Sequence, residues 1–144
     1  MNELINFENI KVKAEAKDWE EAIEIAGYLL LKSGKIKREY VDNMIKAVID
    51  MGPYIVITPG LALAHAEPSP AVLEDAVSII NLKNPVNFGS VNDPVNVILC
   101  LASTDSNSHI SILQAVAEKL MIEGMIDRIA SCESEQEIYS LINE

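Results

Sequence analysis

Cysteine is scarce in this chain of 144 residues, which contains only Cys100 and Cys132. Two cysteines so far apart cannot provide the disulfide framework of a small secreted domain, and neither belongs to a C-x-x-C pair. Cys100 lies inside the apolar run 95–101, where a buried and unreactive thiol is the simplest interpretation. We therefore expect neither disulfide bonds nor a cysteine-based metal site.

Basic residues are scarce as well, with 11 Lys and Arg against 22 Asp and Glu and a formal net charge of -11. A chain this negative is repelled by nucleic-acid backbones and by anionic lipid. We therefore expect neither nucleic acid nor a membrane surface among its partners, whereas basic protein surfaces are suitable.

Glycine and proline are few, at 6 residues each, while apolar residues make up 49% and charged residues 23% of the chain. This composition excludes collagen-like, low-complexity and wholly disordered proteins. Because 144 residues is close to the commonest domain size, we expect one hydrophobic core in a single domain spanning residues 1–144.

Apolar stretches long enough to span a membrane are missing. Residues 1–6 contain neither the basic region nor the apolar region of a signal peptide. The sequence therefore predicts a cytoplasmic protein without direct membrane insertion.

The spacing of apolar residues changes along the chain from a helical period to short continuous runs. Asp18 followed by Glu21, and Ser134 followed by Glu137, have the spacing of capping boxes and predict helix starts. Near-continuous apolar runs are typical of strands covered on both faces, so the sequence predicts a single α/β domain. Helices are expected over about 19–32, 38–51, 110–120, a short segment ending near 130, and 135–142, and strands over 9–13, 54–58, 61–64, 76–82, 86–88 and 95–102.

The chain has two histidines, and both occupy positions suited to chemistry. His65 stands where the apolar segment 61–64 gives way to a polar loop, a place where strands end and side chains become exposed. His109 falls in the first turn of a predicted helix, behind the capping residues of loop 103–108. Free N–H groups and the helix dipole favour an anion there and a neutral imidazole that donates a hydrogen bond. A nucleophilic imidazole, a donor imidazole and a helix N-terminus together suit a phosphoryl group.

Other interpretations of the same residues stay open. Either histidine can be a surface residue, and His109 can simply accompany the helix cap. A zinc site lacks three ligands at suitable spacing, a serine hydrolase lacks its G-x-S-x-G turn, and nucleotide binding lacks a glycine-rich loop. Nothing indicates a cofactor.

Residues 52–68 read GPYIVITPGLALAHAEP. This segment resembles the phosphorylation site of the mannitol/fructose-type enzyme IIA proteins (EIIA type 2) of the bacterial phosphoenolpyruvate-dependent sugar phosphotransferase system. Its opening is most similar to the ascorbate-type branch, and the resemblance extends over nearly the whole chain.

The resemblance implies the mannitol-type enzyme IIA fold, a mixed and mostly parallel sheet with helices on both faces. It also implies that His65 accepts phosphate from the phosphocarrier HPr and passes it to a cysteine of the cognate enzyme IIB, which works with the membrane subunit IIC. His109 would lie beside His65 and hold the phosphoryl group.

The chain departs from the family pattern around His65. The family usually has proline directly before the active histidine and often arginine two residues after it, where this chain has Ala64 and Glu67. Without the proline the backbone before His65 is looser, and the Glu67 carboxylate would stabilise the imidazolium and repel a phosphoryl group. An arginine found near the site in mannitol-type members has no counterpart in residues 46–50.

Two alternatives to a transport role remain at this point. The chain can be a regulatory module that binds partner proteins according to its phosphorylation state, or a scaffold that no longer takes phosphate. The sequence does not indicate the sugar, and it leaves a homodimer open.

Overall fold

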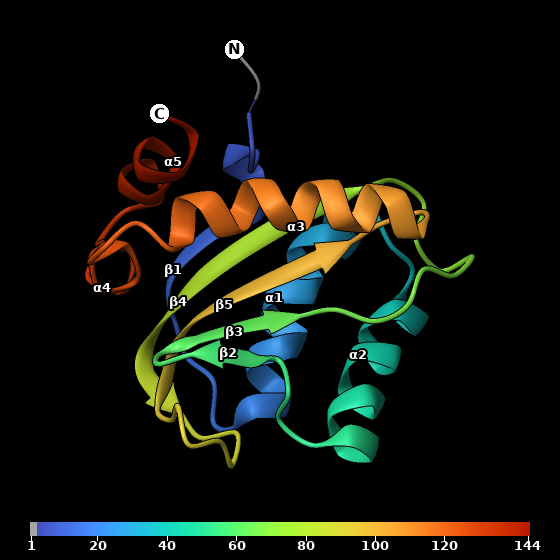
Figure 1. The fold of residues 1–144 in the computed structure, drawn as a ribbon, viewed down its shortest axis with the longest axis horizontal. Helices are drawn as coiled ribbons and strands as arrows, with labels where there is room; N and C mark the ends of the chain where they lie inside the picture. Colours follow the sequence, from blue (N-terminus) through green and yellow to red (C-terminus); the bar gives the residue numbers. More distant parts are fainter. Residues whose placement is uncertain (1–2) are drawn as a thin grey trace.

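The computed structural model describes residues 3–144, and for Ser108 and His109 it describes the backbone alone. Within this range the strands form one sheet of five in the order β1-β4-β5-β3-β2 (Figure 1). β1 pairs with β4 and β3 with β5 in parallel, whereas β4 with β5 and β2 with β3 are antiparallel. The strands are β1 (Ile10–Ala14), β2 (Val56–Thr58), β3 (Leu61–Ala64), β4 (Ala76–Val86) and β5 (Val95–Ala102).

The α/β class and the mixed sheet with helices on both faces are confirmed. Parallel and antiparallel pairs are equal in number, although the resemblance implies a mostly parallel sheet. The predicted strand over 86–88 is wrong: Val86 is the last residue of β4 and pairs with Val95 of β5. The next residues leave the sheet because the Phe88 N–H bonds to the Asp93 carboxylate and not to a strand.

Two helices begin where the capping boxes at Asp18 and Ser134 predict. The Glu21 N–H donates to Asp18 Oδ1 at 2.9 Å, and the Glu137 N–H donates to Ser134 Oγ at 3.2 Å. The elements are the 3-10 turn η1 (Phe7–Asn9) and the helices α1 (Trp19–Lys32), α2 (Arg38–Met51), α3 (Ser106–Leu120), α4 (Met125–Ala130) and α5 (Glu135–Asn143).

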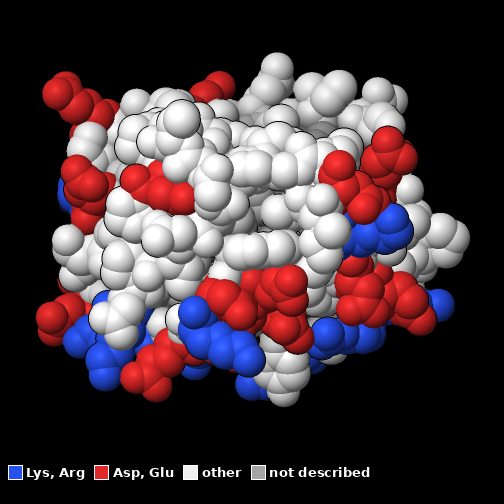
Figure 2. All heavy atoms as spheres, turned by 90° about the horizontal axis from the view of Figure 1, so that it is seen from below, with Lys and Arg blue, Asp and Glu red and all other residues white. Residues whose placement is uncertain are grey.

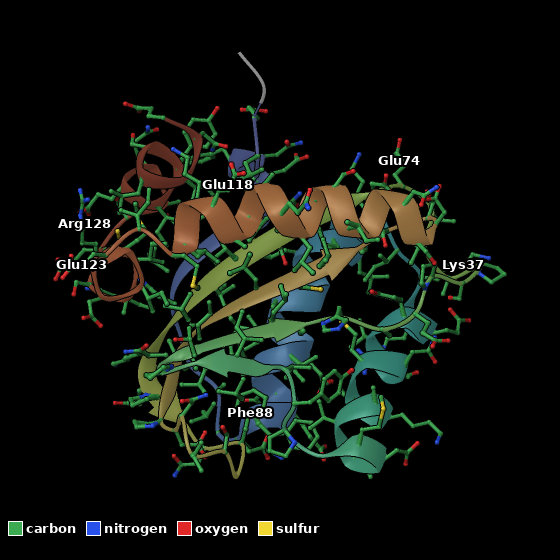
Figure 3. The ribbon with its side chains drawn as sticks, viewed as in Figure 1. Lys37, Glu74, Phe88, Glu118, Glu123 and Arg128 are labelled. Atoms are coloured by element: carbon green, nitrogen blue, oxygen red, sulfur yellow. The ribbon has the colours of Figure 1, made fainter. Side chains whose placement is uncertain are left out.

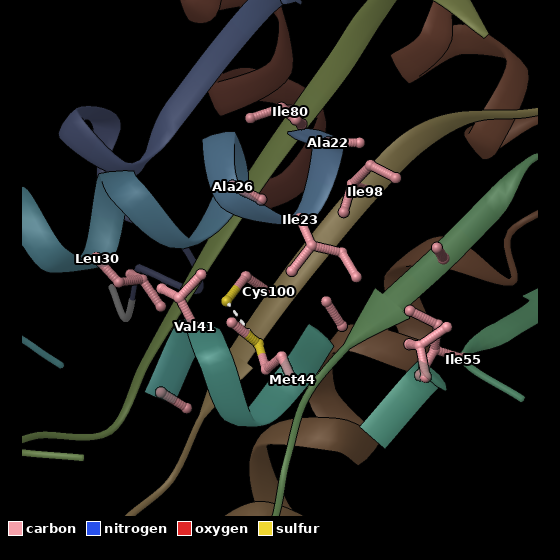
Figure 4. Packing of buried hydrophobic residues seen from close by; sticks show 14 of the residues in the cluster. Ala22, Ile23, Ala26, Leu30, Val41, Met44, Ile55, Ile80, Ile98 and Cys100 are labelled. Atoms are coloured by element: carbon pink, nitrogen blue, oxygen red, sulfur yellow. Dashed lines mark hydrogen bonds between the residues drawn. The ribbon is translucent and has the colours of Figure 1, made fainter. Parts of the chain in front are cut away.

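Two hydrophobic cores lie on opposite faces of the sheet, because successive strand residues point in opposite directions. The even-numbered residues of β3 and β5, such as Ala62 and Ile98, pack under α1 and α2 (Figure 4). The odd-numbered residues of β3, and those of β5 from Val97 onward, pack under α3, α4 and α5, as Leu63 and Leu99 do. The buried core residues contributed by these three helices are Val116, Leu120, Met125, Ile129, Ile138 and Ile142.

The topology places several chain segments together at one end of the strands, where β3 and β5 finish. Because β3 and β5 are parallel, the residues that follow both strands lie together, near the right-hand side of Figure 1. α3 begins at this same end and runs across the sheet, while α2 lies beside it on the other face. His65 directly follows β3 and therefore lies where these segments meet.

Within residues 3–144 there is no helix of the length and apolar character needed to cross a membrane.

Candidate active site

His65 is half-buried, and its ring is fixed by a backbone contact. Its Nδ1 lies 2.8 Å from the Leu63 carbonyl oxygen. A carbonyl can only accept a hydrogen bond, so Nδ1 must carry the proton. In the neutral ring the lone pair then resides on Nε2, which makes Nε2 the nucleophilic nitrogen.

A hollow of about 720 Å³ opens beside His65. Tyr54 lies at its wall with its ring nearly perpendicular to the imidazole, the ring centroids being 5.7 Å apart at an interplanar angle of 81°. The hollow is lined from α2, the turn before β2, the loop after β3 and the start of α3. Its residues are Asn43, Lys46, Ala47, Asp50, Met51, Tyr54, His65, Ala66, Glu67, Pro68, Ser69, Ser106 and Ile110.

The charge of the hollow is mixed. Among the described residues that line it, Lys46 is the single Lys or Arg, and Asp50 and Glu67 are the carboxylates. Lys46 Nζ lies 2.5 Å from Asp50 Oδ2, and both side chains are exposed. Partial burial, and then the nearby Glu67 carboxylate, raise the pKa of Tyr54. A phosphoryl group on His65 would therefore meet one exposed cationic side chain and two anionic ones.

His109 is placed only through its backbone. It lies in the first turn of α3, between Ser106 and Ile110, which both line the hollow. Its side chain lies outside the described residues, so the meeting of His65 and His109 stays a prediction. What the backbone does provide is the start of a long helix at the edge of the hollow, where free N–H groups favour an anion.

Both cysteines are buried, as the apolar surroundings of Cys100 predict. Burial raises the pKa of the Cys100 thiol to about 12, and its Sγ donates to Met44 Sδ at 3.6 Å (Figure 4). A thiol this hard to ionise is a poor nucleophile. In the described part of the chain, no cluster of three His, Cys, Asp or Glu side chains could hold a metal ion.

The sequence interpretation missed two residues of this site, Tyr54 and Lys46. Tyr54 carried a signal, because it belongs to segment 52–68 and precedes β2 by two residues. Lys46 carried a weaker signal, because it belongs to residues 46–50, the stretch in which the resemblance looks for a site arginine. The pattern of α2 predicts which helix face is buried, but not that Lys46 on the opposite face lines the hollow beside His65.

Comparison with known proteins identifies the class to which this fold and site belong. Residues 3–144 match the family described as phosphoenolpyruvate-dependent sugar phosphotransferase system, EIIA 2. The ascorbate-specific PTS system EIIA component of Escherichia coli (strain K12) is 35% identical over 143 residues, which cover 97% of this chain and 92% of that protein.

Solved structures of similar proteins have the same fold. The solution structure of the mannitol-specific cryptic phosphotransferase enzyme IIA CmtB from Escherichia coli superposes with a TM-score of 0.89, at 30% identity and 98% coverage of both chains. The complex of enzyme IIAMTL and phosphorylated enzyme IIBMTL from Escherichia coli gives 0.84, at 27% identity and 96% coverage of both chains.

The chain belongs to the EIIA type 2 family of the phosphoenolpyruvate-dependent sugar phosphotransferase system. Its role is accordingly that of a phosphoryl carrier in a sugar phosphotransferase system.

Proposed function

We propose that His65 is the residue that carries the phosphoryl group, accepting it from HPr in the cytoplasm and delivering it to a cysteine of a cognate enzyme IIB. The observation that supports this most strongly is the His65 ring itself. Its Nδ1 donates to Leu63 and its nucleophilic Nε2 belongs to a half-buried residue on a hollow of about 720 Å³.

Two in-line transfers make up the proposed cycle. In the first, His65 Nε2 attacks phosphorus as the P–N bond to the donor histidine of HPr breaks and that imidazole leaves. In the second, the thiolate of enzyme IIB attacks as the bond between Nε2 and phosphorus breaks. The hydrogen bond from Nδ1 to Leu63 holds the ring in one orientation through both steps.

The surroundings of His65 supply charge and shape for these steps. The first turn of α3 presents helical N–H groups toward an anion, and His109 in that turn is the proposed second donor. Lys46 can exchange its Asp50 partner for a phosphoryl oxygen, since both side chains are exposed. The ring of Tyr54, packed nearly perpendicular to the imidazole, limits the movement of His65.

Exposed apolar side chains border the hollow and favour protein partners. Met51 is 65% and Ile110 is 55% exposed, and both line the hollow beside Tyr54. Large exposed apolar side chains grouped around a reactive residue are typical of a docking surface. The similar complex with phosphorylated enzyme IIBMTL makes an enzyme IIB the first partner to test. The ascorbate-specific relative makes ascorbate the first uptake substrate to test for the system.

The test is reconstitution of the chain with phosphoenolpyruvate, enzyme I and HPr, read by mass spectrometry. One phosphoryl group is expected, located on His65, labile in acid and stable in base, and absent from His65→Gln. Phosphoramidate serves as a second donor that needs no protein docking. Labelling by phosphoramidate without labelling by HPr would overturn the HPr assignment, and full labelling of His65→Gln would overturn the site.

A further inference from the structure

Tyr40 is a buried tyrosine of α2 whose hydroxyl reaches the backbone next to His65. Its side chain is 0% exposed, and its hydroxyl donates to the Leu101 carbonyl oxygen at 2.7 Å. The Ala66 N–H donates to the same hydroxyl at 3.0 Å. The Ala66 carbonyl oxygen, at 3.2 Å, is the more distant alternative acceptor.

The hydroxyl therefore connects two chain segments through one oxygen atom. It has a single proton, which the shorter contact assigns to Leu101 near the end of β5, and its lone pair accepts from Ala66. Burial raises the pKa of Tyr40 far above its ordinary value, so the proton stays in place at any physiological pH.

This connection fixes the backbone on the C-terminal side of His65, in addition to the attachment on its N-terminal side. The residue before His65 is held by the sheet, where Ala64 pairs with Cys100 of β5. The residue after it, Ala66, is held by Tyr40 to Leu101 of the same strand. His65 thus lies between two attachments to β5, and the position of its Nε2 depends on both.

We infer that Tyr40 is a positioning residue for phosphoryl transfer, which holds the peptide after His65 so that Nε2 keeps its place at the hollow. The inference rests on the proposed role of His65. Tyr40 is not among the described residues that line the hollow, so it acts through Ala66. Small displacements of a reacting atom reduce rates strongly, because near-attack geometry is narrow.

The test is Tyr40→Phe, which removes the hydroxyl and keeps the buried ring. With phosphorylated HPr as donor, the maximal transfer rate should fall about tenfold, while the HPr concentration for half-maximal rate stays within about twofold of wild type. Exchange of the Ala66 amide with solvent should become about tenfold faster or more in nuclear magnetic resonance spectra, because that N–H loses its acceptor.

Two matched variants separate positioning from a general loss of stability. Ser78→Ala removes another buried hydroxyl that donates to a backbone carbonyl at 2.7 Å, that of Ala26 in α1. Tyr139→Phe removes a tyrosine hydroxyl that bonds to Glu3 near the chain termini. Both should transfer phosphate at the wild-type rate when folded, as checked by circular dichroism.

The transfer rates distinguish a failure of the Tyr40 role from a failure of the His65 role on which it rests. If wild type is labelled and Tyr40→Phe has the same maximal rate, the proposed role of Tyr40 is wrong, whereas the proposed role of His65 as phosphoryl carrier is retained. The role is also wrong if Ser78→Ala slows transfer equally, or if only the half-maximal HPr concentration changes. If wild type takes no phosphate on His65, the proposed function is wrong and the inference fails with it.

Discussion

Glu67 places a negative charge near His65, because its exposed carboxylate lines the same hollow and raises the pKa of Tyr54. Replacing it should speed phosphorylation of His65, since a dianionic phosphoryl group is repelled by a carboxylate and attracted by a guanidinium. With phosphoramidate as donor, we expect Glu67→Gln to react about two- to fivefold faster than wild type and Glu67→Arg faster still. A labelling time course measures this, and a slower Glu67→Arg would contradict it.

His109 provides a second prediction at the residue scale. If it donates a hydrogen bond to the phosphoryl group, His109→Ala should still take phosphate on His65, only about ten- to a hundredfold more slowly, because a hydrogen bond to a charged group contributes about 1.5–3 kcal/mol. His109→Gln keeps an N–H donor and should recover part of the rate. Equal rates for His109→Ala and wild type would contradict the hydrogen bond to the phosphoryl group and leave His109 with no role beyond its place in the first turn of α3.

At the scale of elements, the predictions succeeded where neighbouring residues carry the information. The capping pairs of α1 and α5 lie three residues apart, so their spacing alone predicts both helix starts. The extent of β4 depends instead on Val95, a residue of another strand. The local pattern alone therefore predicts a separate strand at 86–88, which does not form. The end of β3 at His65 was predictable from the change of period, whereas the orientation of α2 toward His65 follows from packing across the sheet.

The loop between β4 and β5 is held by one carboxylate. Asp93 accepts hydrogen bonds from the backbone N–H groups of Phe88, Gly89 and Ser90 at 2.8–3.0 Å. Phe88 packs against Trp19 of α1, with ring centroids 5.9 Å apart. Figure 3 shows Phe88 at the lower end of the molecule, away from the ends of β3 and β5 that carry the candidate site. The loop should therefore affect stability and leave phosphoryl transfer unchanged.

Asp93→Asn should lower the free energy of unfolding by about 1–3 kcal/mol near pH 7, because the N–H groups lose a charged acceptor. Burial raises the pKa of Asp93, but the three N–H groups outweigh burial and hold it below its ordinary value. A carboxyl group whose pKa is lower in the folded than in the unfolded state stabilises the fold at pH values above its unfolded pKa of about 3.9. This stabilisation is lost as the pH falls through the folded pKa. Urea unfolding from pH 7 to pH 2 measures the difference between wild type and variant.

That difference should shrink below about pH 4. Asp42→Asn is the matched control, because the Asp42 carboxylate is exposed and its contact with Arg38 is 3.4 Å long. This change should alter the free energy of unfolding by less than about 0.5 kcal/mol. An Asp93→Asn effect that stays constant with pH would contradict the role of the carboxylate.

At the scale of the whole molecule, the net charge of -11 should govern the encounter with partners. Seen from below, acidic and basic side chains are interspersed over the lower part of the surface, while the upper part is largely uncharged (Figure 2). A basic partner is attracted by the excess of negative charge, and dissolved salt screens this attraction.

We expect the association rate with HPr to fall about tenfold between about 20 mM and 500 mM salt, as measured by stopped-flow fluorescence. Phosphoramidate is itself an anion, so its reaction with His65 should not slow over the same range. An HPr association rate that is independent of salt would contradict electrostatic steering.

The central claim is that Nε2 of His65 carries the phosphoryl group, and nitrogen-15 spectroscopy of the phosphorylated chain tests it most directly. With ¹⁵N-labelled histidine, coupling to phosphorus should appear on Nε2 of His65, while Nδ1 keeps the proton that it donates to Leu63. His65→Gln should show no such coupling at any other residue. Coupling on Nδ1 of His65, or a phosphoryl group on any other side chain, would contradict the claim.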